Sequence, residues 1–394
     1  MKILVISSYL PYPLHSGGHI RLYNLIKELS KKHEITLICE KRLHQTMEDI
    51  QEMEKICKKV VTVNRGKQWS VKNIAKTATS LHSFLVTGHT HQEMKQMIMD
   101  ELVRDQFDLI HVETFYVMQN LPKISLPVVL VDHNIEYQVY KRFVEQVPKA
   151  LRPLLALDIL KIKRDEEFSW KAADKVIAVS QDDKKIMEQK GLKPEVISNG
   201  VNVDDFAFKV KSTDKSKMRK ILFIGDFKWI QNRDSVQFII DEIWDKISLE
   251  ANAKLWIVGR SIPTDIKNLT DDPDVIFDEK SSEKSAPEIF QEADVLLSPI
   301  RVGGGTSYKI LEAMSCGTPV VTMPMSASAI HAKDGENIVI GENVKELAEK
   351  TIELLKDEKL FAKIAKNGRQ LIEENYSWKK IAIDLGNIYK GVVK

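Results

Sequence analysis

The stretch KILVISSYLPYPLHSGGHIRLYNLIKELSKKHEITLICE, Lys2–Glu40, contains a strand, a helix and a second strand in that order. Its two apolar runs, KILVIS and EITLICE, are hydrophobic at consecutive positions, as expected of parallel strands covered on both faces. The segment between them is amphipathic. Its apolar stripe consists of Ile20, Leu22, Leu25, Ile26 and Leu29. This order predicts a βαβ unit within a parallel, doubly wound sheet.

The same alternation of short apolar runs and helical segments recurs in two series. The first series continues with strands expected at residues 59–63, 109–113, 128–134 and 175–180. The second has strands expected at residues 221–227, 254–260, 275–279, 295–300, 319–323 and 338–341. Between them lies FKVKSTDKSKMRK, which is charged and typical of an exposed connection. We therefore expect an α/β chain with domains at residues 1–206 and 220–377, joined by a linker at 207–219.

Composition narrows the class of protein. A length of 394 residues suggests two or three domains, and a net charge of +2 argues against a dedicated nucleic-acid binder. The three cysteines are far apart and form neither a disulfide framework nor a zinc site. No apolar run approaches the length needed to span a bilayer, and the start reads as a strand rather than a signal peptide. A cytoplasmic protein is expected.

Two glycines precede the first predicted helix. Ligands of open α/β sheets bind beyond the carboxyl ends of the strands, and Gly17-Gly18 lies in such a position. Glycines there allow the backbone to approach a ligand, and the helix N-terminus offers N–H groups to an anion. The alternative is a plain turn that needs glycine for its backbone conformation.

The segment SPIRVGGGTSYKILEAMSCGTPVV, Ser298–Val321, carries a stronger signal. Its loop Gly303, Gly304 and Gly305 has N–H groups that can cradle phosphate oxygens, and Thr306 is expected to N-cap the following helix. Lys309 lies one turn into that helix. Glu312 is a carboxylate on an otherwise apolar stretch, where the two hydroxyl donors of a ribose would satisfy it. In the alternative, Glu312 pairs with a basic neighbour and the glycines form only a tight turn.

These residues resemble a known family. The chain is similar over nearly all its length to the group 1 glycosyltransferases (glycosyltransferase family 4), which depend on nucleotide sugars. The resemblance lies in PYPLHSGGHIRLYNLIKEL, VDHNIEY, SNGVNVDDF, LEAMSCGTPVV and NYSWKK. A subgroup with the signature GGGTxxKxLEAM and a segment like GDFKWIQN is the nearest match, and its members often serve exopolysaccharide assembly.

The resemblance implies a GT-B fold, in which two Rossmann-like domains face each other across a cleft. Residues 1–206 would face the acceptor and residues 220–377 would bind the nucleotide sugar, with the final helix, 378–394, packing back on the first domain. Family members retain anomeric configuration, with a leaving phosphate oxygen taking the acceptor proton. Basic side chains and N–H groups can neutralise the diphosphate, so neither metal nor cofactor is expected.

Carried over by position, the resemblance assigns roles to single residues. Glu312 would bind the ribose hydroxyls, and Gly303 to Thr306 would approach the diphosphate or sugar of the donor. Gly18 would line the cleft from the first domain. His133, after the VVLVD strand, would polarise the transferred sugar; the alternative is a hydrogen-bonded strand-end histidine. Lys228, Arg260 and Lys309 are expected to gather around the diphosphate.

The sequence departs from the family pattern at two places. The family spaces two glutamates eight positions apart, but the position eight before Glu312 is Gly304. An Arg and Lys pair follows the first strand of the second domain in many relatives, whereas here Asp226 and Asn232 fall at those positions. Lys228, Arg233 and Arg260 are candidate substitutes.

Two further groups of residues have open interpretations. The pairs His15/His19 and His89/His91 do not have metal-site spacing, and a surface role is expected for them. The stretch from Tyr140 to Val176 joins many basic residues to an apolar stripe that includes Leu155 and Leu160. It is either a basic amphipathic surface that contacts anionic lipid or a helix packed on the first sheet with its charges outward. The second interpretation is favoured, because Asp165, Glu166 and Glu167 offset the charge.

The expected function is transfer of a hexose-type sugar from a nucleotide diphosphate to a glycan or lipid-linked acceptor, in cell-surface or exopolysaccharide synthesis. One alternative is a nucleotide-sugar 2-epimerase of the same fold, which would consume the donor without an acceptor. Another is a non-catalytic glycosyltransferase-like subunit. The expected partners are the donor, the acceptor and, by peripheral contact, the inner membrane surface, but not nucleic acid.

Overall fold

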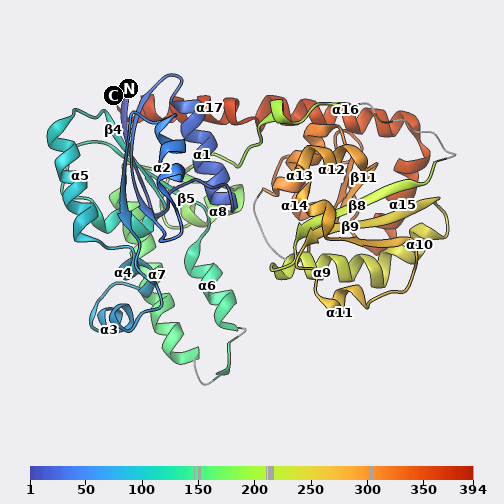
Figure 1. Cartoon of the computed structure of the whole chain (residues 1–394), viewed down its shortest axis with the longest axis horizontal. Coiled ribbons are helices and arrows are strands. Elements are labelled where there is room, and N and C mark those ends of the chain that lie inside the picture. The colour runs from blue at the N-terminus through green and yellow to red at the C-terminus, as the bar shows by residue number, and fades with distance from the viewer. Residues whose placement is uncertain (146, 150–151, 210, 212–216, 302–305, 394) are drawn as a thin grey trace. The chain divides into compact units, whose positions relative to one another are not determined.

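The chain forms two compact units, each built on one parallel sheet. The computed structural model describes residues 1–145, 147–149, 152–209, 211, 217–301 and 306–393. One unit comprises Met1–Ser198 together with Ile381–Lys394, and the other comprises Asn199–Lys380. Helices cover both faces of each sheet (Figure 1). The predicted fold class, α/β with two doubly wound sheets, is confirmed within these residues.

The first unit contains a seven-stranded sheet in its described residues, with the order β3-β2-β1-β4-β5-β6-β7. Its neighbouring strands are all parallel. The expected strands are present, and the additional β7 was missed because only one of its two residues, Val196, is apolar. The strands are β1 (Lys2–Ser7), β2 (Glu34–Lys41), β3 (Lys59–Asn64), β4 (Leu109–Glu113), β5 (Val128–Asp132), β6 (Lys175–Ala178) and β7 (Glu195–Val196).

The helices of the first unit pack on its sheet, with α1 and α5 on opposite faces (Figure 1). Helix α3 and the adjoining ends of α6 and α7 extend away from the sheet (Figure 1). The helices are α1 (Gly17–Leu29), α2 (Met47–Glu54), α3 (Val71–Thr79), α4 (Phe84–Gly88), α5 (Gln92–Arg104), the 3-10 helix η1 (Phe115–Asn120), α6 (Glu136–Glu145), α7 (Arg152–Ala172), α8 (Gln181–Glu188) and the part of α17 (Trp378–Val392) that follows Lys380.

The second unit contains a six-stranded sheet in its described residues, with the order β10-β9-β8-β11-β12-β13. Its strands are β8 (Arg219–Asp226), β9 (Ala253–Arg260), β10 (Val275–Asp278), β11 (Val295–Ser298), β12 (Val320–Thr322) and β13 (Val339–Ile340). Its helices are η3 (Val203–Asp205), α9 (Ile230–Phe238), the π-helix η4 (Ile239–Trp244), α10 (Asp245–Ser248), α11 (Thr264–Lys267), η5 (Lys280–Glu283), α12 (Ala286–Glu292), α13 (Tyr308–Cys316), α14 (Pro324–Ser328), α15 (Val344–Lys356) and α16 (Glu358–Asn375).

Strand order fixes where a ligand can bind in each unit. In the first sheet β1 lies between β2 and β4, and in the second β8 lies between β9 and β11. At these switch points the loops that follow neighbouring strands run to opposite faces of the sheet, which leaves the carboxyl ends open to a ligand. The residues after β1, β4, β8 and β11 are therefore the first to consider.

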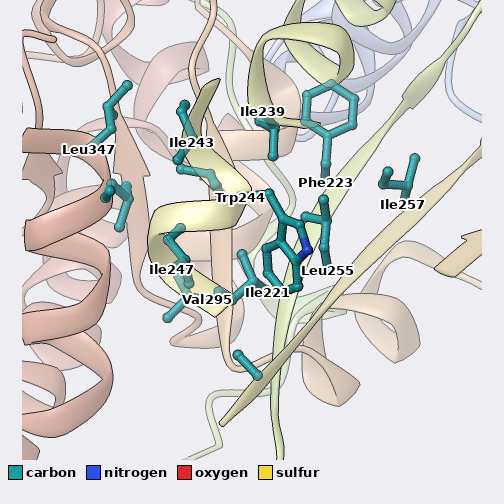
Figure 2. Close-up of a cluster of buried hydrophobic side chains, with 14 of the residues drawn as sticks. Ile221, Phe223, Ile239, Ile243, Trp244, Ile247, Leu255, Ile257, Val295 and Leu347 are labelled. Carbon is teal, nitrogen blue, oxygen red and sulfur yellow. The ribbon is translucent and has the colours of Figure 1, made fainter. Parts of the chain in front are cut away.

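One face of the second sheet packs against η4 and its neighbours. Ile243 and Trp244 lie among strand residues such as Ile221, Phe223 and Leu255, and all are buried (Figure 2). The Trp244 Nε1–H donates to Asp272 Oδ2 at 2.7 Å, so the buried indole keeps a hydrogen bond. This cluster holds the helix that leads away from β8 against the sheet.

We predict that Ile243→Ala destabilises the second unit by about 2–5 kcal/mol, the usual cost of such a truncation in a packed core. Leu249→Ala is the matched control, because Leu249 lies just after α10 and its side chain is 85% exposed. Guanidinium unfolding followed by circular dichroism measures both free energies of unfolding. Equal stability of the two variants would contradict the role of this core.

Candidate functional site

A buried carboxylate organises the carboxyl ends of β1, β4 and β5 in the first unit. Glu113, the last residue of β4, is fully buried. Its oxygens accept hydrogen bonds from His111 Nε2 at 2.7 Å and His133 Nε2 at 2.5 Å, and Arg21 Nε lies 3.8 Å away. Burial alone would raise the pKa of Glu113, but His133 and His111 outweigh it, and the pKa lies below its ordinary value. Glu113 is therefore a carboxylate at neutral pH.

The bond to Glu113 sets the orientation of His133. An ionised carboxylate can only accept, so His133 Nε2 carries the proton of that bond. In the neutral ring this leaves the lone pair on Nδ1. A Cβ placed on Gly18 would lie 3.5 Å from Nδ1 and 3.4 Å from Cε1 of this ring. The missing side chain of Gly18 thus leaves space beside the free nitrogen, and the predicted pair Gly18 and His133 comes together.

Arg21 and Tyr389 extend this network through the first unit. The buried Arg21 guanidinium donates to the carbonyls of Ser198 at 2.7 Å and Ile197 at 2.8 Å. Tyr389, on α17, hydrogen-bonds His111 Nδ1 through its hydroxyl at 2.6 Å. Sequence reasoning missed these members of the Glu113 network. The one available signal was Glu113 itself, an acid that closes the apolar strand LIHVE.

In the second unit, Lys309 is held at the carboxyl end of β8. Its Nζ donates to Asn232 Oδ1 at 2.8 Å and lies 4.4 Å from the centre of the Phe223 ring. Asn232 in turn donates through Nδ2 to the Asp226 carbonyl at 2.8 Å. A Cβ on Gly225 would come within 2.6 Å of the Asn232 amide, so this position requires glycine. Burial lowers the pKa of Lys309 to about 7, although the charge of Glu312 opposes this.

Glu312 lies one turn further along α13. Burial raises the pKa of its carboxyl to about 7, against the influence of Lys309. Within the described residues, no hydrogen bond or ion pair to this carboxylate is found. The buried hydroxyls of Thr306 and Ser298 likewise lack a partner in the described part of the chain. Buried polar groups are normally paired, so the segment from the end of β11 into α13, which carries these three groups, is a candidate site for a polar ligand.

The start of α13 differs from the prediction by one position. Ser307, not Thr306, is the N-cap residue, and its side chain forms no capping hydrogen bond. Thr306 instead lies before the helix with its side chain buried. The predicted donor-binding residues Gly303, Gly304 and Gly305 lie outside the described residues.

Lys228 and Arg260 lie at neighbouring strand ends. Arg260 ends β9 and pairs in register with Asp226 of β8, and Lys228 follows two residues after Asp226. Both are exposed, and neither side chain has a partner among the described residues. They share this edge with Lys309, which Asn232 connects to the Asp226 carbonyl. Arg233, the other candidate substitute, donates from Nε to the Phe227 carbonyl at 2.5 Å.

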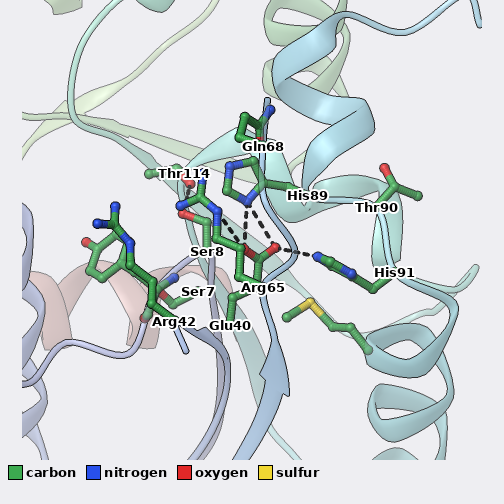
Figure 3. A network of polar contacts seen from close by, with 12 residues as sticks. Ser7, Ser8, Glu40, Arg42, Arg65, Gln68, His89, Thr90, His91 and Thr114 are labelled. Carbon is green, nitrogen blue, oxygen red and sulfur yellow. Dashed lines mark hydrogen bonds and ion pairs between the residues drawn. The ribbon is translucent and has the colours of Figure 1, made fainter. Parts of the chain in front are cut away.

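The expected surface role of His89 is wrong. His89 is buried, and His89 Nδ1 and His91 Nε2 lie 2.9 Å and 3.0 Å from the oxygens of the buried Glu40 (Figure 3). A buried carboxylate requires such partners, and they are supplied by a segment far from it in sequence. In the described part of the chain there is no group of His, Cys, Asp or Glu residues arranged to hold a metal ion.

The acidic residues of α7 offset basic charge only in part. Asp165 and Glu166 are buried, and Asp165 Oδ1 pairs with Arg164 at 3.0 Å. Asp165 Oδ2 accepts from the Ser83 N–H at 2.8 Å, and Glu166 accepts from the N–H groups of Glu136 and Tyr137 at 2.8 and 3.2 Å. They hold the starts of α4 and α6. In the described residues no helix is long and apolar enough to cross a membrane.

Comparisons with known proteins agree with this architecture. The chain is 22% identical, over 96% of its length and 97% of the relative, to an uncharacterized 44.6 kDa protein from the cps region of Klebsiella pneumoniae. Its structure is similar to sucrose-phosphate synthase from Thermosynechococcus elongatus, with a TM-score of 0.68, 16% identity and 99% of each chain covered. It is also similar to HepE from Anabaena in complex with UDP and glucose, with a TM-score of 0.62, 15% identity, and 99% and 100% coverage.

Family models match both units. Residues 15–205 match the model described as Glycosyltransferase Family 4, and residues 218–357 match the one described as Glycosyl transferases group 1. The resemblance found in the sequence is confirmed at the level of family and fold. The chain therefore belongs to glycosyltransferase family 4, the group 1 glycosyltransferases, and has the GT-B fold.

Proposed function

We propose that this glycosyltransferase moves a sugar from a nucleotide-diphosphate donor to a glycan or lipid-linked acceptor and retains the anomeric configuration. The observation that carries the proposal lies in α13 and just before it. Thr306 has a buried hydroxyl without a partner among the described residues, and burial shifts the pKa of both Lys309 and Glu312 to about 7. HepE, which shares this fold, has been crystallised with UDP-glucose, which supports a nucleotide-sugar donor.

The second unit would bind the donor through complementary charges. A ribose diol has two O–H donors, which match the unpaired carboxylate of Glu312. Lys309, with Lys228 and Arg260 at the ends of β8 and β9, would neutralise the diphosphate. The N–H groups of Gly303, Gly304, Gly305 and Thr306 would add to this, so that no metal ion is required.

The first unit would bind the sugar under transfer and the acceptor. Glu113 fixes His133, whose Nδ1 is available to a sugar hydroxyl beside Gly18. In retaining transfer the leaving phosphate oxygen takes the acceptor proton, so His133 would polarise the sugar rather than act as the base. The relative from a cps region supports a role in capsule or exopolysaccharide synthesis, at the cytoplasmic face of the membrane.

Contact with that membrane is supported by exposed apolar residues on the part of the first unit that extends from the sheet. Trp69 is 76% exposed and Val71, the first residue of α3, is 85% exposed. Lys161 on α7 donates to the carbonyls of Thr77 and Ser80 and so joins α3 to the basic helix. Arg164 pairs with Asp165, so the basic residues left to meet anionic lipid headgroups are exposed ones such as Lys141 and Arg142 on α6.

The pH dependence of donor binding tests the assignment of Glu312 and Lys309. Both side chains have a pKa of about 7. As pH falls below 7, Glu312 becomes protonated and stops accepting from the ribose; as pH rises above 7, Lys309 loses its charge. We predict a bell-shaped affinity for a nucleotide-diphosphate sugar. Glu312→Gln should weaken binding and remove the acid limb, and Lys309→Arg should remove the alkaline limb.

Calorimetric titration of UDP-, GDP- and dTDP-sugars from pH 6 to 8.5 measures how the affinity falls on the acid and alkaline sides. Failure of every donor to bind at any pH would overturn the proposed function. Conversion of a bound donor to an isomerised sugar without acceptor would instead indicate the 2-epimerase.

The space beside His133 gives a steric test. Gly18→Ala would place a methyl group 3.2 Å from the Tyr9 hydroxyl and 3.4 Å from the His133 ring. We predict that transferase kcat/KM falls at least tenfold, because small displacements of reacting groups are costly. Donor affinity and thermal stability should stay unchanged. Gly66→Ala is the matched control, because a Cβ there meets no atom within 4 Å. Equal kcat/KM in the two variants would show that His133 and Gly18 do not line the catalytic site.

Membrane contact is tested by sedimentation with vesicles. We predict that the protein binds phosphatidylglycerol vesicles in preference to phosphatidylcholine vesicles, and that Trp69→Ser with Val71→Ser weakens this binding at least tenfold, because burying such side chains contributes about 1.5–3 kcal/mol each. The control is Val103→Ser, on α5, where the side chain is equally exposed. A contact through α3 would be contradicted if the double variant still bound the vesicles, or if the double variant and Val103→Ser lost binding equally.

A further inference from the structure

A second cluster of charges lies at the carboxyl ends of β2 and β3, beside the Glu113 network. Strand β2 is the neighbour of β1 in the sheet, and β3 is the next strand outward. Glu40 lies near the end of β2, Arg42 follows this strand, and Arg65 follows β3. Gln45 donates to the carbonyls of Leu10 and Tyr12 at 3.1 and 2.6 Å, which ties the loop after β2 to the loop after β1.

The carboxylate of this cluster, Glu40, is already paired with other residues of the chain. Glu40 is fully buried, and His89, His91 and Arg65 converge on it (Figure 3). Its distance to Arg65 Nε is 3.7 Å. Burial raises the pKa of Glu40, but the hydrogen bonds from His89 and His91 outweigh this and keep the pKa below its ordinary value. Glu40 is therefore ionised, and its single negative charge balances at most one arginine.

Arg42 is the second arginine, and its charge is not balanced. It is exposed, and its side chain forms no hydrogen bond or ion pair with the described residues. Burial lowers the pKa of Arg65, and the charge of Arg42 lowers it further against the pull of Glu40. Burial and then Arg42 lower the pKa of His19 to about 4. Arg42 and Arg65 lie in the same cluster around Glu40 (Figure 3), and this edge carries more positive charge than Glu40 balances.

The cluster is continuous with the site around His133. Ser8, after β1, and Thr114, after β4, lie in the same network (Figure 3), and their hydroxyls are 3.1 Å apart. Thr114 directly follows Glu113 and has a φ of +72°, a strained conformation for a β-branched residue. His19 is one residue from Gly18, which lies against the His133 ring. A molecule held at Arg42 would therefore reach the ring of His133 over the ends of β1 and β4.

We propose that Arg42 and Arg65 bind an anionic group on the acceptor, either a phosphate or a sugar carboxylate. The proposal rests on the proposed function, because it takes the first unit as the acceptor side. Guanidinium groups bind both anions through paired hydrogen bonds, and a partly buried arginine loses less of this attraction to water. Balancing Glu40 explains Arg65 but not the presence of Arg42 next to it. An anionic ligand accounts for both.

The test compares acceptor analogues of equal length and different charge. Octyl glucuronide, octyl glucoside 6-phosphate and the uncharged octyl glucoside are titrated into the full-length protein saturated with UDP. We expect at least one anionic analogue to bind tenfold or more tightly than octyl glucoside, and its affinity to fall with added salt. Preference for the glucuronide identifies a sugar carboxylate, and preference for the 6-phosphate identifies a phosphate.

Variants test whether the preference for an anionic analogue comes from Arg42. Arg42→Gln should reduce the affinity for the preferred anionic analogue at least tenfold, and Arg42→Lys should restore part of it. Arg104→Gln, which removes the same charge from the exposed surface of α5, should have no effect. UDP affinity, a property of the second unit, should be equal in all variants.

Two results would overturn the proposal: equal binding of all three analogues by the wild type, or equal loss in Arg42→Gln and Arg104→Gln. In either case intact UDP binding would leave the proposed function standing. If the wild type binds none of UDP, GDP and dTDP, the proposed function itself fails; if it binds GDP or dTDP instead, that nucleotide replaces UDP in this test.

Discussion

A buried carboxylate cannot remain ionised without partners, and this constraint determines the construction of the first unit. Glu113 ends a central strand with no access to water, so its charge has to be met from within the fold. Arg21 on α1, His111 on the same strand and His133 after β5 meet it from three elements. This requirement thus sets the positions of α1 and of the end of β5, and the orientation of the His133 ring.

In the second unit, Asn232 holds the basic side chain of Lys309 at the end of β8. At the position where the family resemblance predicts a lysine after the first strand of this domain, the chain has Asn232. The structure gives this asparagine a different use, because it connects the Asp226 carbonyl to the ammonium group of Lys309 on α13. A cation is thereby held at the end of β8 although it comes from another segment. Gly225 makes room for the amide, which explains why Gly and Asn occur together in GDFKWIQN.

Local signals were sufficient to predict the strands but not the polar networks. Consecutive apolar residues, as in ILFIGDF and VLLSPI, identify strands because burial on both faces leaves no alternative pattern. The position of Gly18 beyond the end of a strand followed in the same way, whereas that of His133 came from the family resemblance. The partners of Glu40 could not be predicted, since His89 and His91 lie some fifty residues away and their spacing shows only that they are close to each other. The acidic residues on α7 were predicted only in part for a related reason: sequence gives their charge but not the backbone N–H groups that they also bind.

The path of α17 has a consequence for how the protein is made. Tyr389 completes the hydrogen-bond chain to His111 and Glu113 in the first unit, yet it is translated after all of Asn199–Lys380. The nascent first unit therefore leaves the ribosome with its central charge network incomplete, while the second unit can form from one continuous segment. Completion of the first unit is therefore a late step, which follows synthesis of the whole second unit.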